Sequence, residues 1–194
     1  LYPKVKITDE MIVERPDLKQ YRGKELTVIA WIWARTVKSP NPAFRDVDVP
    51  LASTFMLSTK AGKEAYVEPV IDNGSYRFTV KVGKPKNNEA AKLGTSAGKR
   101  SGFICLMSNT PLPYNYIRDE GKAGRMSERL MAIVAEGDRG RVYLAPIEDQ
   151  EMVAASAKPS WRPEAALPDN PRDFKTPNYG MPTFGDLFTS RQLV

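Results

Sequence analysis

The chain has no histidine and a single cysteine, Cys105, among its 194 residues. One cysteine excludes an internal disulfide framework and suits a reducing cytoplasm, which is where we expect the protein. A structural zinc site takes about four Cys or His ligands, so we expect no metal in this chain. The absence of histidine also removes the commonest general base. These absences weigh against a stand-alone enzyme.

The chain also lacks a long apolar run. The longest, residues 28–34, is far shorter than the roughly 20 residues of a membrane-spanning helix, so no membrane partner is expected. Hydrophobic residues still make up 41% of the sequence, which is enough for a sizeable core. The sequence begins at Leu1 and stops at a segment typical of a helix interior, residues 192–194, which suggests a piece of a larger protein.

Periodic patterns predict an antiparallel sheet with short helices. In residues 76–82 every second side chain is apolar, which predicts one core-facing row: Tyr76, Phe78, Val80 and Val82. The turn signal at residues 72–75 predicts that this strand pairs with residues 65–71. Further strands are expected at 26–34, 49–58, 103–107, 130–135 and 141–144, a loop at 83–102, and helices at 9–15, 114–129 and 148–157.

The composition changes at Lys158. Prolines recur from there to the end of the chain and disfavour helices and central strands: Pro159, Pro163, Pro168, Pro171, Pro177 and Pro182. Aromatic residues are nevertheless spread along this part, unlike in most disordered tails: Trp161, Phe174, Tyr179, Phe184 and Phe188. We therefore expect a mixed α+β domain over residues 1–157, with a lead-in at 1–24, and a C-terminal arm at 158–194 that wraps a surface.

The formal charge of +6 and the isoelectric point near 9.4 permit nucleic-acid binding without establishing it. A basic loop and a stripe on the predicted helix at 114–129 supply candidate phosphate contacts: Lys81, Lys84, Lys86, Lys99, Arg100, Arg118, Lys122, Arg125 and Arg129. The alternatives are a loop enriched in lysine for solubility, and a charged helix face that pairs with Glu120 and Glu128.

Two further features have more than one interpretation. Trp31 and Trp33 share a face if their segment is a strand, and indoles can stack on nucleobases, although core packing is favoured. Cys105 lies among apolar residues with nothing nearby to lower its pKa. We expect it to be a small buried hydrophobe.

Five longer stretches carry a family resemblance. They are WARTVKSPNP (33–42), GKEAYVEPV (62–70), RLMAIVAEG (129–137), RGRVYL (139–144) and NYGMPTFGDLFTSRQLV (178–194). Together they resemble the large adenine-specific DNA methylases with a zinc-ribbon insert, in particular the branch found with anti-phage defence genes. The resemblance implies a DNA-contacting, target-recognition-like region. The S-adenosylmethionine-binding half would precede it and the catalytic Asp-Pro-Pro-Tyr-type motif would follow it in the parent protein.

The chain departs from this family at the ribbon. Where the zinc-bearing relatives have cysteines, it has Ser39, Phe44, Cys105 and Ser108. The resemblance therefore implies a degenerate ribbon held by packing rather than by metal. The expected function is a non-catalytic region that binds duplex DNA beside the rest of the methylase chain. The alternative is a structural module whose aromatic arm docks the halves of the parent or another defence protein.

Overall fold

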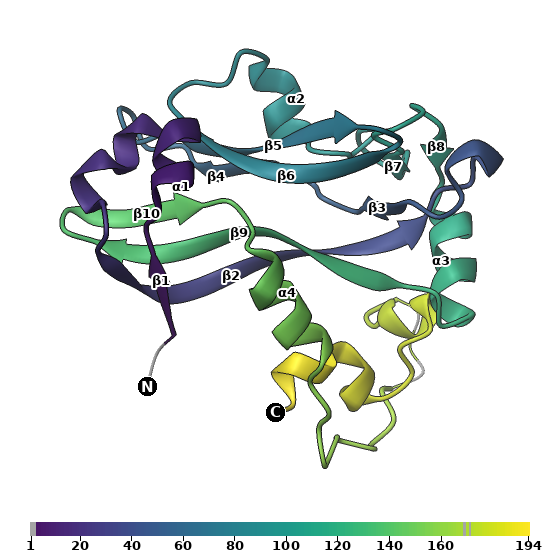
Figure 1. Cartoon of the computed structure of the whole chain (residues 1–194). Coiled ribbons are helices and arrows are strands. Elements are labelled where there is room, and N and C mark those ends of the chain that lie inside the picture. The colour runs from purple at the N-terminus through teal and green to yellow at the C-terminus, as the bar shows by residue number, and fades with distance from the viewer. Residues whose placement is uncertain (1–2, 169, 171) are drawn as a thin grey trace.

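The computed structural model describes residues 3–168, 170 and 172–194, and it has the expected α+β class (Figure 1). A long strand, β2 (Glu25–Lys38), is the centre of the larger sheet. The order of this antiparallel sheet is β1 (Lys4–Lys6), β2, β9 (Ser127–Gly137) and β10 (Gly140–Leu144). A fifth strand, β3 (Asp48–Pro50), pairs with the C-terminal end of β2, where Val37 lies opposite Val49.

A second antiparallel sheet has the order β4 (Met56–Ser58), β5 (Ala65–Asp72) and β6 (Ser75–Val82). The predicted hairpin between β5 and β6 is confirmed. Asp72 pairs with Ser75, and the two turn residues Asn73 and Gly74 have φ values of 46° and 77°. Of the four predicted core residues of β6, Val82 is instead 50% exposed. The single strand predicted at 49–58 is wrong, because β3 and β4 belong to different sheets.

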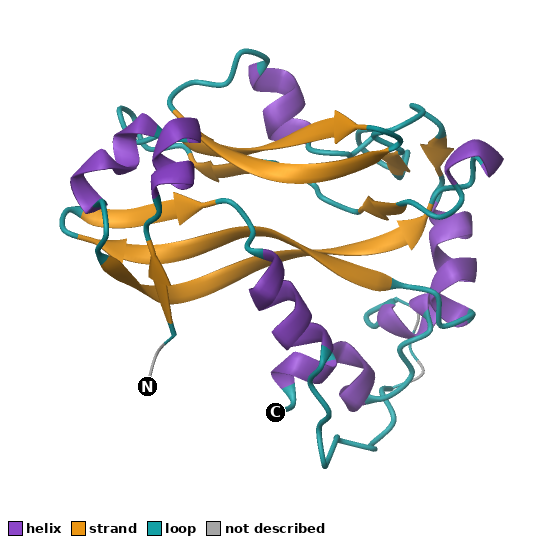
Figure 2. Ribbon diagram, in the orientation of Figure 1, coloured by secondary structure: helices purple, strands orange, loops and turns teal. Residues whose placement is uncertain are grey.

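The second sheet lies over the first, as Figure 2 shows, and apolar side chains fill the space between them. Met131 and Ala132 of β9 contribute from one sheet, and Val67 and Phe78 contribute from the other. The helix α1 (Asp9–Glu14) and the short 3-10 helix η1 (Pro16–Tyr21) cover a neighbouring cluster. Thr8 caps α1 through its hydroxyl, as its position predicts.

The segment predicted as one loop at 83–102 contains a helix, α2 (Asn88–Leu93). The Asn87 side chain accepts a hydrogen bond from the Ala90 N–H at 3.0 Å and starts it. Beyond it, the short strands β7 (Phe103–Ile104) and β8 (Pro111–Leu112) pair with each other.

The helix predicted at 114–129 is too long. Helix α3 (Tyr114–Lys122) stops before Gly124, which has a φ of 69°, and the chain then enters β9. A left-handed glycine just past a helix is a common stop signal. The helix predicted at 148–157 is confirmed as α4 (Glu148–Ala155). No helix among the described residues is long and apolar enough to cross a membrane.

The C-terminal arm lies on its own domain. It forms the 3-10 helices η3 (Thr176–Tyr179), η4 (Phe184–Leu187) and η5 (Ser190–Gln192), while Asp169 and Pro171 are outside the described residues. Tyr179 packs into the cluster formed by β2, β3 and α3. At the other end of the arm, Arg191 pairs with Glu128. These contacts join the arm to α3 and to the larger sheet.

Candidate functional site

Three of the four predicted ribbon positions, Ser39, Cys105 and Ser108, lie in contact, whereas no hydrogen bond within the described residues joins Phe44 to them. β2 ends at Lys38, and the turn that follows places the Ser39 hydroxyl oxygen 3.4 Å from the Cys105 sulfur, with both residues buried. The Asn41 N–H donates to the Ser39 hydroxyl at 3.2 Å. On the other side, the Asn109 N–H donates to the Cys105 carbonyl at 2.8 Å, and Asn109 has a φ of 56°. Two tight turns from distant parts of the chain therefore meet at one point.

Cys105 is buried, as expected, but its surroundings are more polar than the sequence suggests. Burial disfavours the thiolate and would raise the pKa. Hydrogen bonds to the sulfur from Ser108 and Ser39, and from the N–H groups of Met107 and Ser108, outweigh burial and hold the pKa of the thiol below its ordinary value. The expectation that nothing nearby lowers this pKa was therefore wrong.

These side chains do not fit zinc. Ser39, Phe44, Cys105 and Ser108 offer one thiol, two hydroxyls and a phenyl ring, whereas structural zinc takes thiolates and imidazoles. Within residues 3–168, 170 and 172–194 there is no group of three His, Cys, Asp or Glu residues that could hold a metal ion.

Three of the nine predicted phosphate contacts are paired with acids. Lys81 lies 3.9 Å from Glu68, and Arg125 forms a short ion pair of 2.6 Å with the buried Glu120. Arg129 lies 3.0 Å from Glu151. Because α3 ends at Lys122, Arg125 and Arg129 do not continue its face. The predicted four-residue stripe is therefore not formed.

The other predicted cations lie in separate places. Lys84 and Lys86 follow β6, Lys99 and Arg100 lie in the turn before β7, and Arg118 and Lys122 lie on α3. All six are exposed. Arg118 lies over the ring of Tyr179 at 5.5 Å, and the other five form no ion pair with any described part of the chain. The sequence therefore identified free cations without revealing that they are dispersed.

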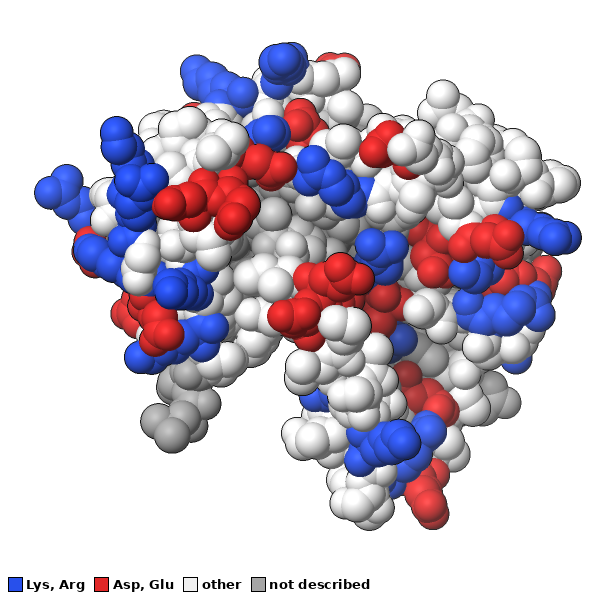
Figure 3. Space-filling view, viewed as in Figure 1, with Lys and Arg blue, Asp and Glu red and all other residues white. Residues whose placement is uncertain are grey.

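Sequence reasoning missed a basic groove. A cavity of about 320 Å³ lies where the turn before β5, the end of β6 and the β9–β10 turn meet, and its cationic rim is Lys63, Arg139 and Arg141. The Lys63 ammonium donates to the Arg139 carbonyl at 3.0 Å. Lys84 follows Val82, which also lines the groove. In Figure 3 Lys and Arg side chains are numerous at this left-hand end of the molecule, with Asp and Glu side chains among them.

The floor of the groove is held by the contacts of a buried arginine. Arg15 is almost fully buried there and donates to the carbonyls of Val80 at 3.1 Å and Tyr143 at 3.0 Å. Asp17 pairs with the same guanidinium at 2.7 Å. Arg15 therefore ties η1 to both sheets beneath the rim, whose exposed cations lie in the turn before β5 and in the β9–β10 hairpin.

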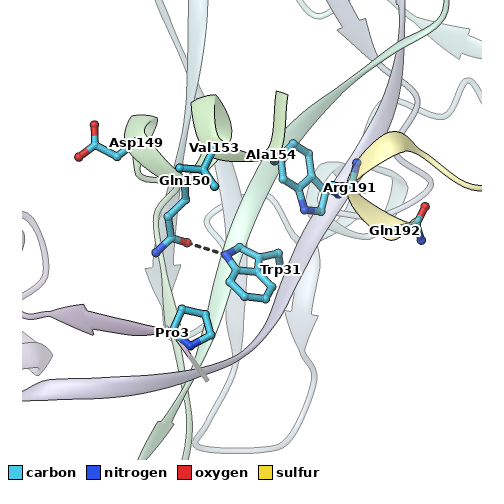
Figure 4. A pocket seen from close by; sticks show the side chains of 9 residues that line it. Pro3, Trp31, Asp149, Gln150, Val153, Ala154, Arg191 and Gln192 are labelled. Carbon is cyan, nitrogen blue, oxygen red and sulfur yellow. Dashed lines mark hydrogen bonds between the residues drawn. The ribbon is translucent and has the colours of Figure 1, made fainter. Parts of the chain in front are cut away.

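A second cavity is aromatic. It measures about 620 Å³ and lies between β2, α4 and η5, with Trp31, Trp33 and Arg191 on its walls (Figure 4). Trp31 is 39% exposed, and its indole N–H donates to the Gln150 side-chain oxygen at 2.5 Å. The expectation of core packing for both tryptophans is therefore wrong for Trp31.

Comparisons of the chain with protein-family models, with curated proteins and with solved structures found no match. No family is thereby assigned. The resemblance to the adenine-specific methylases accordingly stays a prediction from the sequence.

Proposed function

We propose that the chain is a non-catalytic, DNA-contacting region of an N6-adenine DNA methyltransferase of bacterial anti-phage defence. The observation that carries the DNA contact is the groove rimmed by Lys63, Arg139 and Arg141. Lys84, two residues after the lining residue Val82, is a fourth exposed cation that we expect to reach the same phosphate backbone. The family resemblance supplies the enzyme class. A net charge of +6 favours association with a polyanion.

The groove suits a phosphate backbone because its cations come from segments distant in sequence that meet at one place, namely the turn before β5 and the β9–β10 hairpin. Each phosphate that these cations neutralise releases condensed counterions from duplex DNA, which makes the affinity depend steeply on salt. The contact would position the DNA backbone, while base-specific contacts would read the sequence.

The first prediction is the salt dependence of duplex binding. Four phosphate contacts give a slope of log K against log salt of about −3.6, so affinity falls about 150-fold between about 0.05 and 0.2 M salt. Fluorescence anisotropy of a labelled duplex measures this directly. Absence of binding at the lowest salt, or an affinity that does not change with salt, contradicts the proposal.

Methyl transfer is assigned to other parts of the parent. The sequence has no Asp-Pro-Pro-Tyr-type motif and no glycine-rich phosphate loop of recognised spacing. We therefore derive no reaction step from these residues, and S-adenosylmethionine would bind outside this region. A cytoplasmic location of the protein is part of the same proposal.

We also propose that the meeting of Ser39 with Cys105 is the remnant of a zinc ribbon. The supporting observation is that two turns distant in sequence approach within 3.4 Å at two of the four expected ligand positions. Restoring the ligands with Ser39→Cys, Phe44→Cys and Ser108→Cys is expected to create a four-thiolate site. Such a site should bind one equivalent of Co²⁺ with tetrahedral absorption bands.

The matched control for this prediction is the double variant Ser39→Cys and Phe44→Cys, which supplies only three thiolates. It should bind Co²⁺ more weakly than the triple variant. A triple variant that folds, as judged by circular dichroism, but shows no thiolate–Co²⁺ absorption would rule out the ribbon interpretation.

A structural or interaction module remains the second candidate, because the arm exposes aromatic side chains. Trp161 is 69% exposed, and Phe184 and Phe188 are each more than 40% exposed. Single exposed apolar residues are common, so this alternative requires these aromatic side chains to form one contiguous patch. Under this alternative the arm binds another part of the methylase or a partner defence protein, and the chain shows no salt-dependent affinity for DNA.

A further inference from the structure

We propose that the aromatic cleft between β2, α4 and η5 holds an unpaired nucleobase of a DNA strand, stacked on Trp31. The inference rests on the proposed DNA contact and extends it to a second site with different chemistry. The groove offers charge to phosphates, whereas the cleft offers an aromatic face and a few polar groups (Figure 4).

The proposed stacking surface, the Trp31 indole, is already held in one orientation without a ligand. Trp31 and Trp33 both line the cleft from β2. The Arg191 guanidinium lies 4.0 Å from the centre of the Trp33 ring and is itself paired with Glu128, so this wall is already filled. Trp31 is the ring left with an exposed face, and its hydrogen bond to Gln150 fixes the orientation of the indole. A fixed, exposed indole is the kind of surface on which bases stack.

Polar groups around the cleft can meet the edge of a base. The side-chain oxygen of Gln150 already accepts the hydrogen bond from the Trp31 indole N–H. The side-chain oxygen of Gln192 accepts a hydrogen bond from the Thr189 N–H at 2.9 Å. Within the described residues, the NH₂ groups of both amides have no partner and can donate. The Asp149 carboxylate, also on the cleft wall, can accept. Nucleobase edges carry both acceptors and donors, so they can satisfy this set.

The size of the cleft agrees with this ligand. A cavity of about 620 Å³ is within the range of roughly 300–1,000 Å³ typical of ligand sites and has room for a purine. An apolar peptide side chain would also fill the space, but it would form no hydrogen bond with the two amides or the carboxylate. Because a purine offers the larger face for stacking, adenine should bind more tightly than thymine.

The test uses the fact that the chain has three tryptophans, two of which line the cleft. The variant Trp161→Phe leaves only Trp31 and Trp33, so its tryptophan fluorescence reports on the cleft. We expect a 12-nucleotide oligodeoxyadenylate to quench this fluorescence and to bind about tenfold more tightly than an abasic strand with the same backbone. A 12-nucleotide oligothymidylate should bind with intermediate affinity.

In the same background, Trp31→Leu is expected to abolish the preference for the base-bearing strand and to leave the salt slope unchanged, because stacking releases no counterions. Leucine keeps an apolar side chain at this half-exposed position, so the fold should be retained. Trp31→Phe keeps an aromatic face and should retain part of the preference. The control Phe184→Ala removes an exposed aromatic side chain that does not line the cleft and should change nothing.

The outcomes separate the two proposals. Equal binding of the adenylate and abasic strands, unaffected by Trp31→Leu, overturns the cleft inference and leaves the DNA contact in place. If neither strand nor duplex DNA binds, both proposals fail. Quenching by a leucine-rich peptide but by no oligonucleotide also overturns the inference and supports an interaction module.

Discussion

Neutralising the groove with Lys63→Gln, Arg139→Gln and Arg141→Gln is expected to weaken binding to duplex DNA about 500-fold at about 0.1 M salt. Each lost phosphate contact removes about 0.9 from the slope of log K against log salt, which amounts to roughly eightfold per contact at that salt concentration. The slope should therefore fall from about −3.6 to about −1. Fluorescence anisotropy titrations at several salt concentrations measure both quantities.

The matched control removes the same charge from the arm, with Lys158→Gln, Arg172→Gln and Lys175→Gln. All three residues are exposed and none lines the groove. In Figure 1 the arm occupies the end of the molecule away from the β9–β10 turn. The control should reduce affinity less than tenfold, through the general field alone. Equal losses in the two triple variants would show that net charge, rather than the groove, determines binding.

The substitution Gly180→Ala is expected to destabilise the protein by about 3 kcal/mol and to loosen the arm. Gly180 has a φ of 78°, and a methyl group there would collide with the carbonyl of Gly121 in α3. Glycine is therefore required at this position both by the positive φ and by the lack of space for a Cβ atom. The atoms that a Cβ would meet belong to the backbone, so they cannot rotate away. Urea denaturation gives the loss of stability, and limited proteolysis should show faster cleavage between residues 158 and 178.

The control for this substitution is Gly124→Ala. Gly124 has a similar φ of 69°, but a methyl group there would meet no atom within 4 Å. It should cost only about 1 kcal/mol, from backbone strain alone, and should leave the arm protected. Equal costs at the two positions would mean that the contact between Gly180 and α3 does not hold the arm.

Local signals predicted much of the fold. The hairpin at 72–75 and the helix at 148–157 depend on neighbouring residues, and the structure confirms them. One failure was decided by tertiary contacts, since the segment 49–58 divides between two sheets, a choice that residues far away in the chain determine. The other was a local signal that the charge spacing overrode, because the left-handed Gly124 follows the end of α3 where a longer helix was predicted.

The site was harder to predict because its residues come together only when the two sheets pack against each other. Lys63 and Arg139 are 76 positions apart, and only the packing of the two sheets places them on one groove. The charge-rich segments identified exposed lysines such as Lys84, but not that Arg125 and Arg129 are paired with acids. The two ribbon turns were the exception, since the resemblance named Ser39 and Cys105, and the structure brings them into contact.

The most direct test of the central claim is a map of backbone amide shifts when unlabelled duplex DNA is added to the ¹⁵N-labelled protein. The account predicts that the largest changes cluster at residues 60–64, 82–86 and 138–142, which surround the basic groove. Changes confined to α3 and the C-terminal arm, or no changes at a salt concentration of about 0.05 M where counterion release favours binding, would contradict it.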